Sequence, residues 1–446
     1  MLKKNLYILF LLFVLTSSFS QTDFNLPSLE KDKIRFDLVG NLILLPVELN
    51  GVELSFVLDS GVSKPILFNL ANIDSLQINK VETILLRGLG GGDPVEAIKS
   101  KNNFLSIGNA LNVNQDIYVV FDTSINFTPR LGKPVHGIIG YDLFKDFIVE
   151  INYASKYIVL HKPERYIYKS CKKCETFELS FYKNKPFITG EIEVDSNFVP
   201  VKLLIDTGSS DALWIFENED KGLVPTENMY FEDFLGKGLS GNIYGKRSKI
   251  EKFKLKSFEL NNVNTAFPDS TSISFARKNT HRNGSISGEV LKRFNMIVDY
   301  KNKKLTLKKN RNFNASFSYN KSGIIIEQNG VVLIKEREKR SGLGYDDKTD
   351  FNIHVETITH YKLAVKPAYT IVEIRKNSPA EKVGLLRGDV ILTINGKDTH
   401  TLELQHVIGY FKSKTGKLIS LTVDRNGAIM SFDFRLEDVF KQKELP

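Results

Sequence analysis

The chain has 446 residues, 42% of them hydrophobic, which is enough for about three folded domains and excludes an intrinsically disordered protein. The net charge of +9 raises the question of a nucleic-acid partner, with Lys246–Lys256 and Lys301–Lys309 as the basic stretches. Both stretches alternate charged with apolar residues, which is typical of half-buried strands with a solvated face, so we expect no nucleic-acid binding.

Residues 1–20 have the parts of a secretory signal peptide. Lys3 and Lys4 form a basic start, residues 6–15 form an apolar run, and two serines near position 20 suit a cleavage site. The apolar run is shorter than the roughly 20 residues that a membrane-spanning helix needs. We therefore expect an exported protein, periplasmic or extracellular, with no membrane span after signal removal.

Two apolar runs each deliver an aspartate into a tight turn. The second turn follows the first by 147 positions. The turns consist of Asp59, Ser60 and Gly61, and of Asp206, Thr207 and Gly208. One such turn would be unremarkable in a β protein, but two in register call for a shared explanation.

The repeat extends beyond the aspartate turns, because residues 137–161 and 284–308 also match at the same spacing. Each copy predicts short strands, Gly-rich turns and one brief helical piece. The sequence therefore predicts a mainly β fold with two duplicated lobes, residues 21–165 and 166–315.

Two neighbouring carboxylates that share one proton can activate a water molecule and also protonate a leaving amine. This chemistry needs each Asp to leave a strand and enter a turn that only Gly allows, so that two turns can meet. Gly61 and Gly208 meet that need, and the Ser60 and Thr207 hydroxyls could brace the two turns.

With these motifs the duplicated region resembles the pepsin and retropepsin superfamily of aspartic proteases, whose lobes form bilobal β-barrels. In that family an apolar-apolar-Gly motif lies beneath each catalytic turn. Ile138-Ile139-Gly140 matches it, whereas Ser285-Ile286-Ser287 has Ser in place of Gly, with Gly288 adjacent. The resemblance implies a catalytic pair of Asp59 and Asp206, and a local shift to Gly288 would restore the second motif.

The family also has a glycine-tipped hairpin, or flap, in each lobe. Ile84–Ile98 and Phe234–Gly245 occupy the corresponding places, and the first contains no Tyr, which is closer to the retropepsin type. The flap candidates are Gly88, Gly90, Gly91, Gly236 and Gly238. Simple hairpin loops remain the alternative.

The residues after the two Gly suggest a pH dependence. Pepsin-like proteins often have a hydroxyl residue there that donates to the carboxylate, but this chain has Ser209 in one lobe and Val62 in the other. Without that donor Asp59 is more easily protonated, so we expect the pair to keep its proton to a milder pH than in pepsin.

Cys171 and Cys174 are the only cysteines. No strand-then-helix pattern frames them as in a thioredoxin-like site, and zinc would lack two further ligands. We interpret them as a local disulfide or as two idle thiols.

Residues 316–446 change character. Ser378-Pro379 predicts a helix start, Gly384 and Gly388 predict turns, and Asn395-Gly396 predicts a hairpin. This pattern resembles PDZ domains, which bind an extended peptide, often a chain terminus, as an added strand. The ligand-binding loop is expected either at Gly323, Ile324, Ile325 and Ile326, which we favour, or at Ser341–Tyr345. The alternative is a domain that only packs on the lobes.

Together these features predict an exported aspartic endopeptidase that acts on polypeptides and has a PDZ domain for substrate or partner peptides. Because both lobes lie on one chain, we expect a monomer, and the resemblance implies no metal and no other cofactor. The alternative function is a catalytically silent peptide-binding protein, which Ser287 would favour.

Overall fold

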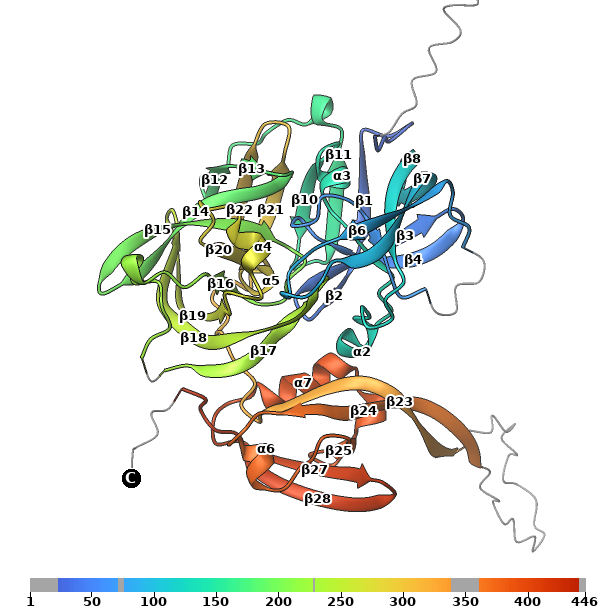
Figure 1. Ribbon diagram of the computed structural model, residues 1–446, viewed down its shortest axis with the longest axis vertical. Helices are drawn as coiled ribbons and strands as arrows, with labels where there is room; N and C mark the ends of the chain where they lie inside the picture. Colours follow the sequence, from blue (N-terminus) through green and yellow to red (C-terminus); the bar gives the residue numbers. More distant parts are fainter. Residues whose placement is uncertain (1–22, 71–75, 228, 338–360, 441–446) are drawn as a thin grey trace, which may run out of the picture. The chain divides into compact units, whose positions relative to one another are not determined.

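The computed structural model describes residues 23–70, 76–227, 229–337 and 361–440. The signal-peptide prediction and the Ser341–Tyr345 loop lie outside these residues. The chain forms two compact units: one contains the residues up to 127, 133–319 and from 439 onward, and the other contains 128–132 and 320–438. Strands dominate both units, which confirms the predicted mainly β fold (Figure 1).

Two eight-stranded sheets in the first unit repeat the same strand order. The first sheet runs β2 (Asp37–Val39), β3 (Leu42–Leu49), β4 (Val52–Leu58), β9 (Gly137–Ile139), β5 (Ile66–Leu67), β8 (Ala110–Val120), β7 (Val95–Ile107) and β6 (Val81–Leu86). The second sheet runs β13 (Ser180–Tyr182), β14 (Lys185–Val194), β15 (Asn197–Asp206), β20 (Gly284–Ser287), β16 (Leu213–Ile215), β19 (Phe258–Pro268), β18 (Gly241–Leu255) and β17 (Phe231–Gly238). The sequence repeat is therefore a repeat of structure, strand for strand.

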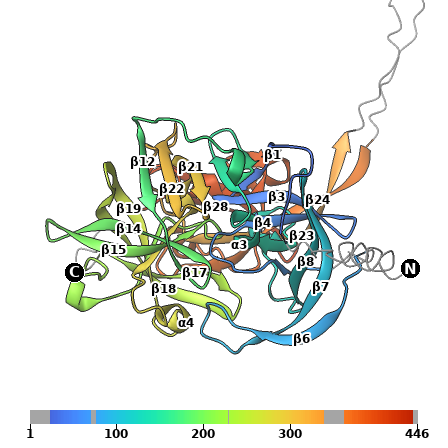
Figure 2. The same cartoon turned by 90° about the horizontal axis from the view of Figure 1, so that it is seen from above.

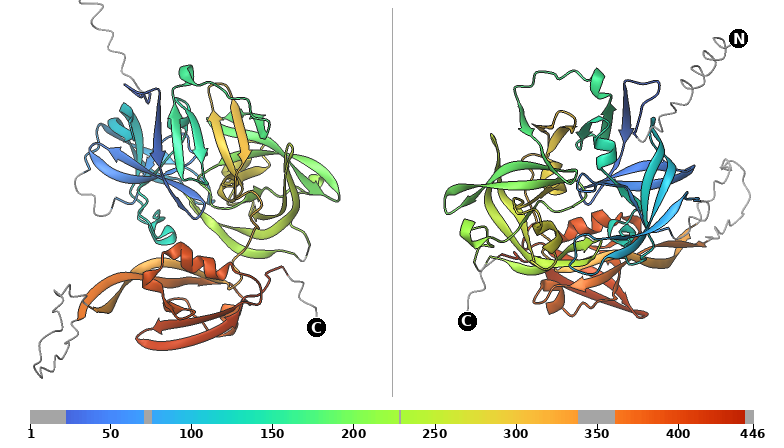
Figure 3. Two further views of the ribbon diagram at one scale, coloured as in Figure 1. Left: turned by 180° about the vertical axis from the view of Figure 1, so that it is seen from behind. Right: turned by 45° about the horizontal axis from the view of Figure 1, so that its top comes forward.

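A third sheet joins the two halves of this unit. Its order is β1 (Lys31–Arg35), β11 (Tyr157–His161), β10 (Ile148–Asn152), β21 (Phe294–Asp299), β22 (Lys304–Lys309) and β12 (Cys174–Glu178). The central pair, β10 and β21, is antiparallel, with Val149 opposite Val298. The left view of Figure 3 shows these strands side by side. One continuous sheet thus fixes the first repeat to the second.

This unit contains several short helices, which are α3 (Tyr141–Phe144), α4 (Ser274–Arg277), α5 (Gly288–Leu291), η1 (Pro163–Arg165) and η2 (Glu219–Lys221). Of these, α3 and α5 follow the repeated strands β9 and β20. The basic run at 301–309 ends in β22, as predicted for a strand with a solvated part. Burial does not alternate there, because Leu305, Thr306 and Leu307 are all buried and the flanking lysines are exposed. Cys171 and Cys174 form a local disulfide at the start of β12.

The second unit contains a six-stranded sheet. Its elements are β23 (Ile324–Arg337), β24 (Tyr361–Ile374), β25 (Val390–Ile394), β26 (Lys397–Asp398), β27 (Leu418–Arg425), β28 (Ala428–Arg435), α6 (Pro379–Lys382), η3 (Thr399–Thr401) and α7 (Leu404–Phe411). Ser378 caps α6 by accepting from the Glu381 amide at 3.3 Å, and Asn395 and Gly396 turn the chain between β25 and β26 with positive φ. These local predictions are confirmed.

One short segment from the middle of the first repeat belongs to the second unit. α2 (Thr128–Leu131) packs beside β23, and Arg130 Nε lies 2.7 Å from Glu327 Oε1. The Gln405 side chain of α7 donates to the Leu131 carbonyl at 3.5 Å. This segment therefore contacts both β23 and α7, the strand and helix that would border a PDZ peptide groove.

Candidate active site

The two aspartate turns face each other. β4 runs parallel to β9 and β15 runs parallel to β20, and each aspartate lies where its strand ends. A Cβ at Gly208 would overlap the Asp59 carboxylate, and a Cβ at Gly61 would lie 3.1 Å from Asp59 Oδ1 and 3.6 Å from Asp206 Oδ1. The turns are thus close enough for each aspartate to act on the other, and position 208 tolerates only Gly.

Four hydrogen bonds between Ser60 and Thr207 and the opposite lobe lock the turns together. The Ser60 amide donates to Thr207 Oγ1 at 2.9 Å, and the Thr207 amide donates to Ser60 Oγ at 3.1 Å. The Ser60 hydroxyl donates to the Ile205 carbonyl and the Thr207 hydroxyl to the Leu58 carbonyl, both at 2.7 Å. Both residues are buried, with only 2% and 1% of their surfaces exposed, so water cannot replace these hydrogen bonds.

Local backbone amides also orient the carboxylates. Gly61 N donates to Asp59 Oδ1 at 2.7 Å, and Gly208 N donates to Asp206 Oδ1 at 3.1 Å. Each Asp keeps part of its surface accessible to solvent. This arrangement fixes the position of both groups while leaving them open to a reacting molecule.

Burial changes the protonation of the pair. It raises the pKa of Asp59 to about 7, with the neighbouring Asp206 charge adding to the rise, and it raises the pKa of Asp206 as well. The backbone amides of Gly208 and Ser209 act in the opposite direction on the Asp206 pKa. Ser209 thus lowers the pKa of Asp206 through its backbone amide, whereas the sequence suggested an effect of its hydroxyl.

Ser287 occupies the place of the expected Gly without a shift in register. It lies opposite Asp206 in the β15–β20 ladder, and Gly288 N donates to Ser209 O just as Tyr141 N donates to Val62 O in the first repeat. The backbone accommodates the Ser287 side chain by a different torsion angle, since ψ is −174° at Ser287 and −97° at Gly140. The compensating shift that the sequence suggested is therefore absent. The Ser287 hydroxyl is buried without a hydrogen-bond partner among the described residues.

The two glycine-tipped hairpins touch at their tips. β6 and β7 form the first hairpin and β17 and β18 the second (Figure 2). The Ser240 amide donates to Leu89 O at 2.9 Å, the Gly92 amide donates to Ser240 O at 2.9 Å, and the Gly88 amide donates to Ser240 Oγ at 3.1 Å. The tips thus form a small interlocked junction between the lobes.

The glycines at this junction have no room for a side chain. A Cβ at Gly88 would lie 2.7 Å from Leu239 Cβ, and a Cβ at Gly90 or Gly238 would overlap the backbone of the opposite tip. Gly91 is held more loosely, with its Cβ position 3.0 Å from Thr271 O. Gly236 is different, because it lies at a bulge of β17 with nothing within 4 Å of its Cβ position.

Gly90→Ala is expected to separate the tips, because φ of +122° is unfavourable for Ala and the methyl group would overlap Gly241. Amide hydrogen exchange of Gly92 and Ser240 should then become at least about tenfold faster, since their bonds across the junction are lost. Gly409→Ala in α7 is the control, because the added methyl group meets open space and the residue does not have a positive φ. Unchanged exchange in Gly90→Ala would mean that the tips are held by other contacts.

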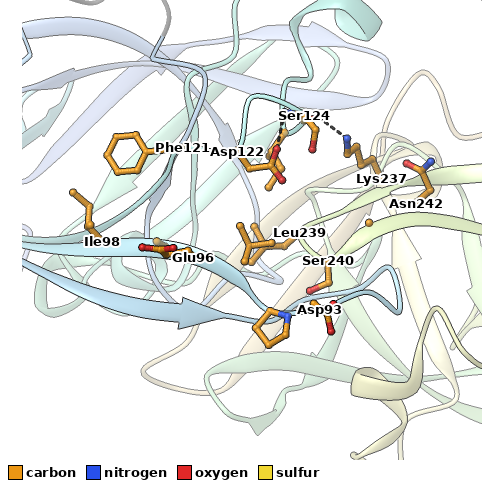
Figure 4. Close-up of a pocket in the computed structure, with 15 residues that line it drawn as sticks. Asp93, Glu96, Ile98, Phe121, Asp122, Ser124, Lys237, Leu239, Ser240 and Asn242 are labelled. Atoms are coloured by element: carbon orange, nitrogen blue, oxygen red, sulfur yellow. Dashed lines mark hydrogen bonds between the residues drawn. The ribbon is translucent and has the colours of Figure 1, made fainter.

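A cavity of about 850 Å³ borders the hairpin tips (Figure 4). It is lined by residues 93–98, by the loop after β8 and by the β17–β18 turn. Lys237 Nζ donates to the Ser124 carbonyl at 2.5 Å across one side of it. Neither Asp59 nor Asp206 lines this cavity, so it belongs to the junction of the tips and not to the carboxylate pair.

Two basic residues near the carboxylates were not anticipated from the sequence. Lys185 lowers the pKa of both Asp59 and Asp206, and Arg282 lowers that of Asp206. The sequence motifs do not single out either residue. The signal that could have identified them is a strand-by-strand comparison of the two repeats, in which both cations replace apolar residues.

The favoured PDZ loop lies at the start of β23. Gly323 has φ of +83° and Ile324 and Ile326 are buried, so these isoleucines contribute to the core rather than to an open surface. The amides of Ser322 and Gly323 donate to Asn320 Oδ1 at 3.0 and 3.3 Å. The Asn320 side-chain oxygen therefore accepts from both amides of this loop.

Within the described ranges, no group of three or more His, Cys, Asp or Glu side chains is arranged to hold a metal ion. Among the same residues, no helix is long and apolar enough to cross a membrane.

Comparisons with known proteins support both parts of this description. Residues 45–143 match the aspartyl protease family model, and residues 370–425 match the PDZ domain model. A segment of 76 residues is 36% identical to the carboxy-terminal processing protease CtpB of Bacillus subtilis (strain 168). That segment covers 17% of this chain and 15% of the relative, so the similarity concerns a small part of both proteins.

Proposed function

We propose that this chain, which combines an aspartyl protease domain with a C-terminal PDZ domain, is an exported aspartic endopeptidase. The observation that carries the proposal is the pair of facing Asp turns, braced by reciprocal bonds between Ser60 and Thr207. The first turn lies inside the matched protease segment, and the second repeats its geometry strand for strand.

In the proposed reaction Asp59 and Asp206 share one proton. The ionised carboxylate removes a proton from water, whose oxygen attacks the peptide carbonyl, while the protonated carboxyl group donates to the carbonyl oxygen. Transfer of a proton to the nitrogen then breaks the C–N bond and restores the pair. The rigid turns supply positioning, because neither carboxylate needs to move between these steps.

The PDZ domain is proposed to bind substrate or partner peptides along β23. A ligand there would compete with the contacts that Arg130 and Leu131 make to β23 and α7, and its carboxylate would compete with Asn320 for the loop amides. These internal contacts mimic those of a ligand, which fits a groove with an affinity for extended chains.

The proposal is tested by incubating the chain from Gln21 onward with a diverse peptide pool from pH 3 to pH 8 and identifying products by mass spectrometry. Internal cleavage is the expected result. Absence of cleavage at every pH, by protein whose folding is verified by circular dichroism, would favour the alternative of a silent peptide-binding protein.

Cleavage is expected to continue close to neutral pH and to decline above about pH 7. The shared proton is needed for catalysis, and the pair retains it until pH approaches the raised pKa of about 7 that burial gives to Asp59. In strong acid both carboxyl groups are protonated, no base remains, and the rate falls again. The profile of kcat/KM between pH 3 and pH 8.5 measures this, and activity confined to pH values below about 4 would contradict it.

A further inference from the structure

The two repeats differ in charge at one strand beside the carboxylates. β3 and β14 have the same burial pattern along their first eight residues, which places Lys185 where the first repeat has Leu42. The β14–β15 ladder pairs Phe187 with Leu204. This pair is the last of the ladder. Continued by two more residues, the antiparallel register would bring Lys185 level with Asp206 and on the same face of the sheet, and the Lys185 charge lowers the pKa of both aspartates.

A second cation takes another apolar place. Asn283 Oδ1 accepts from the Lys202 amide at 2.9 Å, as His136 Nδ1 accepts from the Ser55 amide at 3.0 Å. Asn283 and His136 therefore occupy equivalent positions in the two repeats. The residues before them are equivalent too, so Arg282 takes the place of the fully buried Val135.

The side chain of Arg282 contacts β20, the strand that pairs with β15. Its Nε donates to the Gly284 carbonyl at 3.0 Å, and its guanidinium carbon lies 5.0 Å from the centre of the Phe216 ring. Gly284 begins β20, which runs parallel to β15 as far as Asp206. These contacts hold the guanidinium at the start of β20, on the strand next to that of Asp206, and its charge lowers the pKa of Asp206.

Neither cation has a carboxylate within 4 Å in the part of the chain that the structure describes. Both are partly buried, and burial lowers the pKa of Lys185 and lowers that of Arg282 to about 10. The two cations carry two positive charges and a singly protonated pair of aspartates carries one negative charge, so one positive charge remains uncompensated. A desolvated cation without a carboxylate partner favours an anionic ligand.

We propose that Lys185 and Arg282 form an anion-recognition subsite, which selects peptides with a carboxylate close to the scissile bond. This inference rests on the proposed peptidase function. The carboxylate comes either from an Asp or Glu side chain or from the free end of the peptide, and both would place the same group between the two cations.

The test compares four quenched fluorescent peptides of one sequence, with Glu or Gln flanking the scissile bond and with a free or amidated end. Wild type is expected to cleave the preferred carboxylate-bearing peptides with a kcat/KM about tenfold or more above that of their neutral counterparts. Preference for Glu identifies a side-chain carboxylate, and preference for the free end identifies a terminal one.

Lys185→Leu and Arg282→Val install the residue types of the first repeat and should reduce this preference to within about twofold, while the neutral peptide is still cleaved. Lys185→Arg keeps the charge and should retain the preference. Lys221→Gln removes an equal charge from an exposed position of the same repeat and should change nothing. Loss of positive charge beside the pair should also move the pH profile of Lys185→Leu upward, which a purely structural role would not do.

Binding of the same peptides to the inactive Asp59→Asn variant, measured by fluorescence anisotropy, keeps the two proposals separate. Tighter binding of the carboxylate peptides that Lys185→Leu abolishes supports the subsite even without cleavage. Cleavage by wild type with no carboxylate preference overturns the subsite alone, whereas absence of all cleavage overturns the peptidase function. Equal binding of charged and neutral peptides overturns the subsite in either case.

Discussion

Asp59→Asn and Asp206→Asn are each expected to lower kcat/KM for peptide hydrolysis by about 10³-fold or more. Asn has nearly the shape of Asp but can neither accept the proton of water nor return one to the leaving amine, so either substitution removes one half of the acid–base pair. The measurement is the initial rate on a peptide identified from the pool, at the pH optimum of the wild-type protein. Retention of more than about a tenth of wild-type activity by either variant would contradict a shared catalytic role.

The stability of the Asp59→Asn variant provides the control for this experiment. A damaged fold would lower the free energy of unfolding, whereas this substitution is not expected to lower it. The pKa of Asp59 is raised from 3.8 to about 7, so between these values the folded chain binds more protons than the unfolded chain, and the free energy of unfolding falls as pH rises. Removing the ionisable group removes that cost. At pH 8 the Asp59→Asn variant should therefore be at least as stable as wild type in chemical denaturation, and Asp220→Asn, at an exposed position, should change neither activity nor stability.

The duplicated architecture could be predicted because it depends on residues whose type is restricted by their surroundings. Each Asp turn needs a Gly where a side chain would meet a carboxylate, so Gly61 and Gly208 keep the same spacing from their aspartates. The Ser60 and Thr207 hydroxyls were predicted to brace the turns, and they form reciprocal bonds. At these positions the fold accepts few residue types, so the residue type alone predicts the local structure.

Contacts between distant segments were harder to predict. Ser240 bonds to the first hairpin across 152 positions, and nothing in the local sequence names its partner. Lys185 was missed for a related reason. The constant spacing of 147 pairs it with Leu38, whereas the strands place it at Leu42, because the β14–β15 hairpin is two residue pairs longer than the β3–β4 hairpin. Charge and partner at such positions depend on strand register, which a single spacing does not determine.

Thr207→Val is expected to lower the free energy of unfolding by about 2–6 kcal/mol. Val keeps the branched shape, but the Ser60 amide loses its acceptor and the Leu58 carbonyl loses its donor, and each orphaned buried group costs about 1–3 kcal/mol. Urea denaturation measures the loss, with the exposed Thr226→Val as control. A change below about 0.5 kcal/mol would mean that the turns are held by packing alone.

Ser60→Ala removes the other hydroxyl of the same network and should cost a similar amount, because the Thr207 amide and the Ile205 carbonyl lose their partners. The double substitution should then cost less than the two single changes together, since the lobes are already unlocked by the first. The double substitution should also lower kcat by about 10²-fold, because carboxylates displaced by about 1 Å no longer align with the peptide. Additive losses in stability would instead show that each hydroxyl supports only its own lobe, and the two turns could not then be regarded as one preorganised unit.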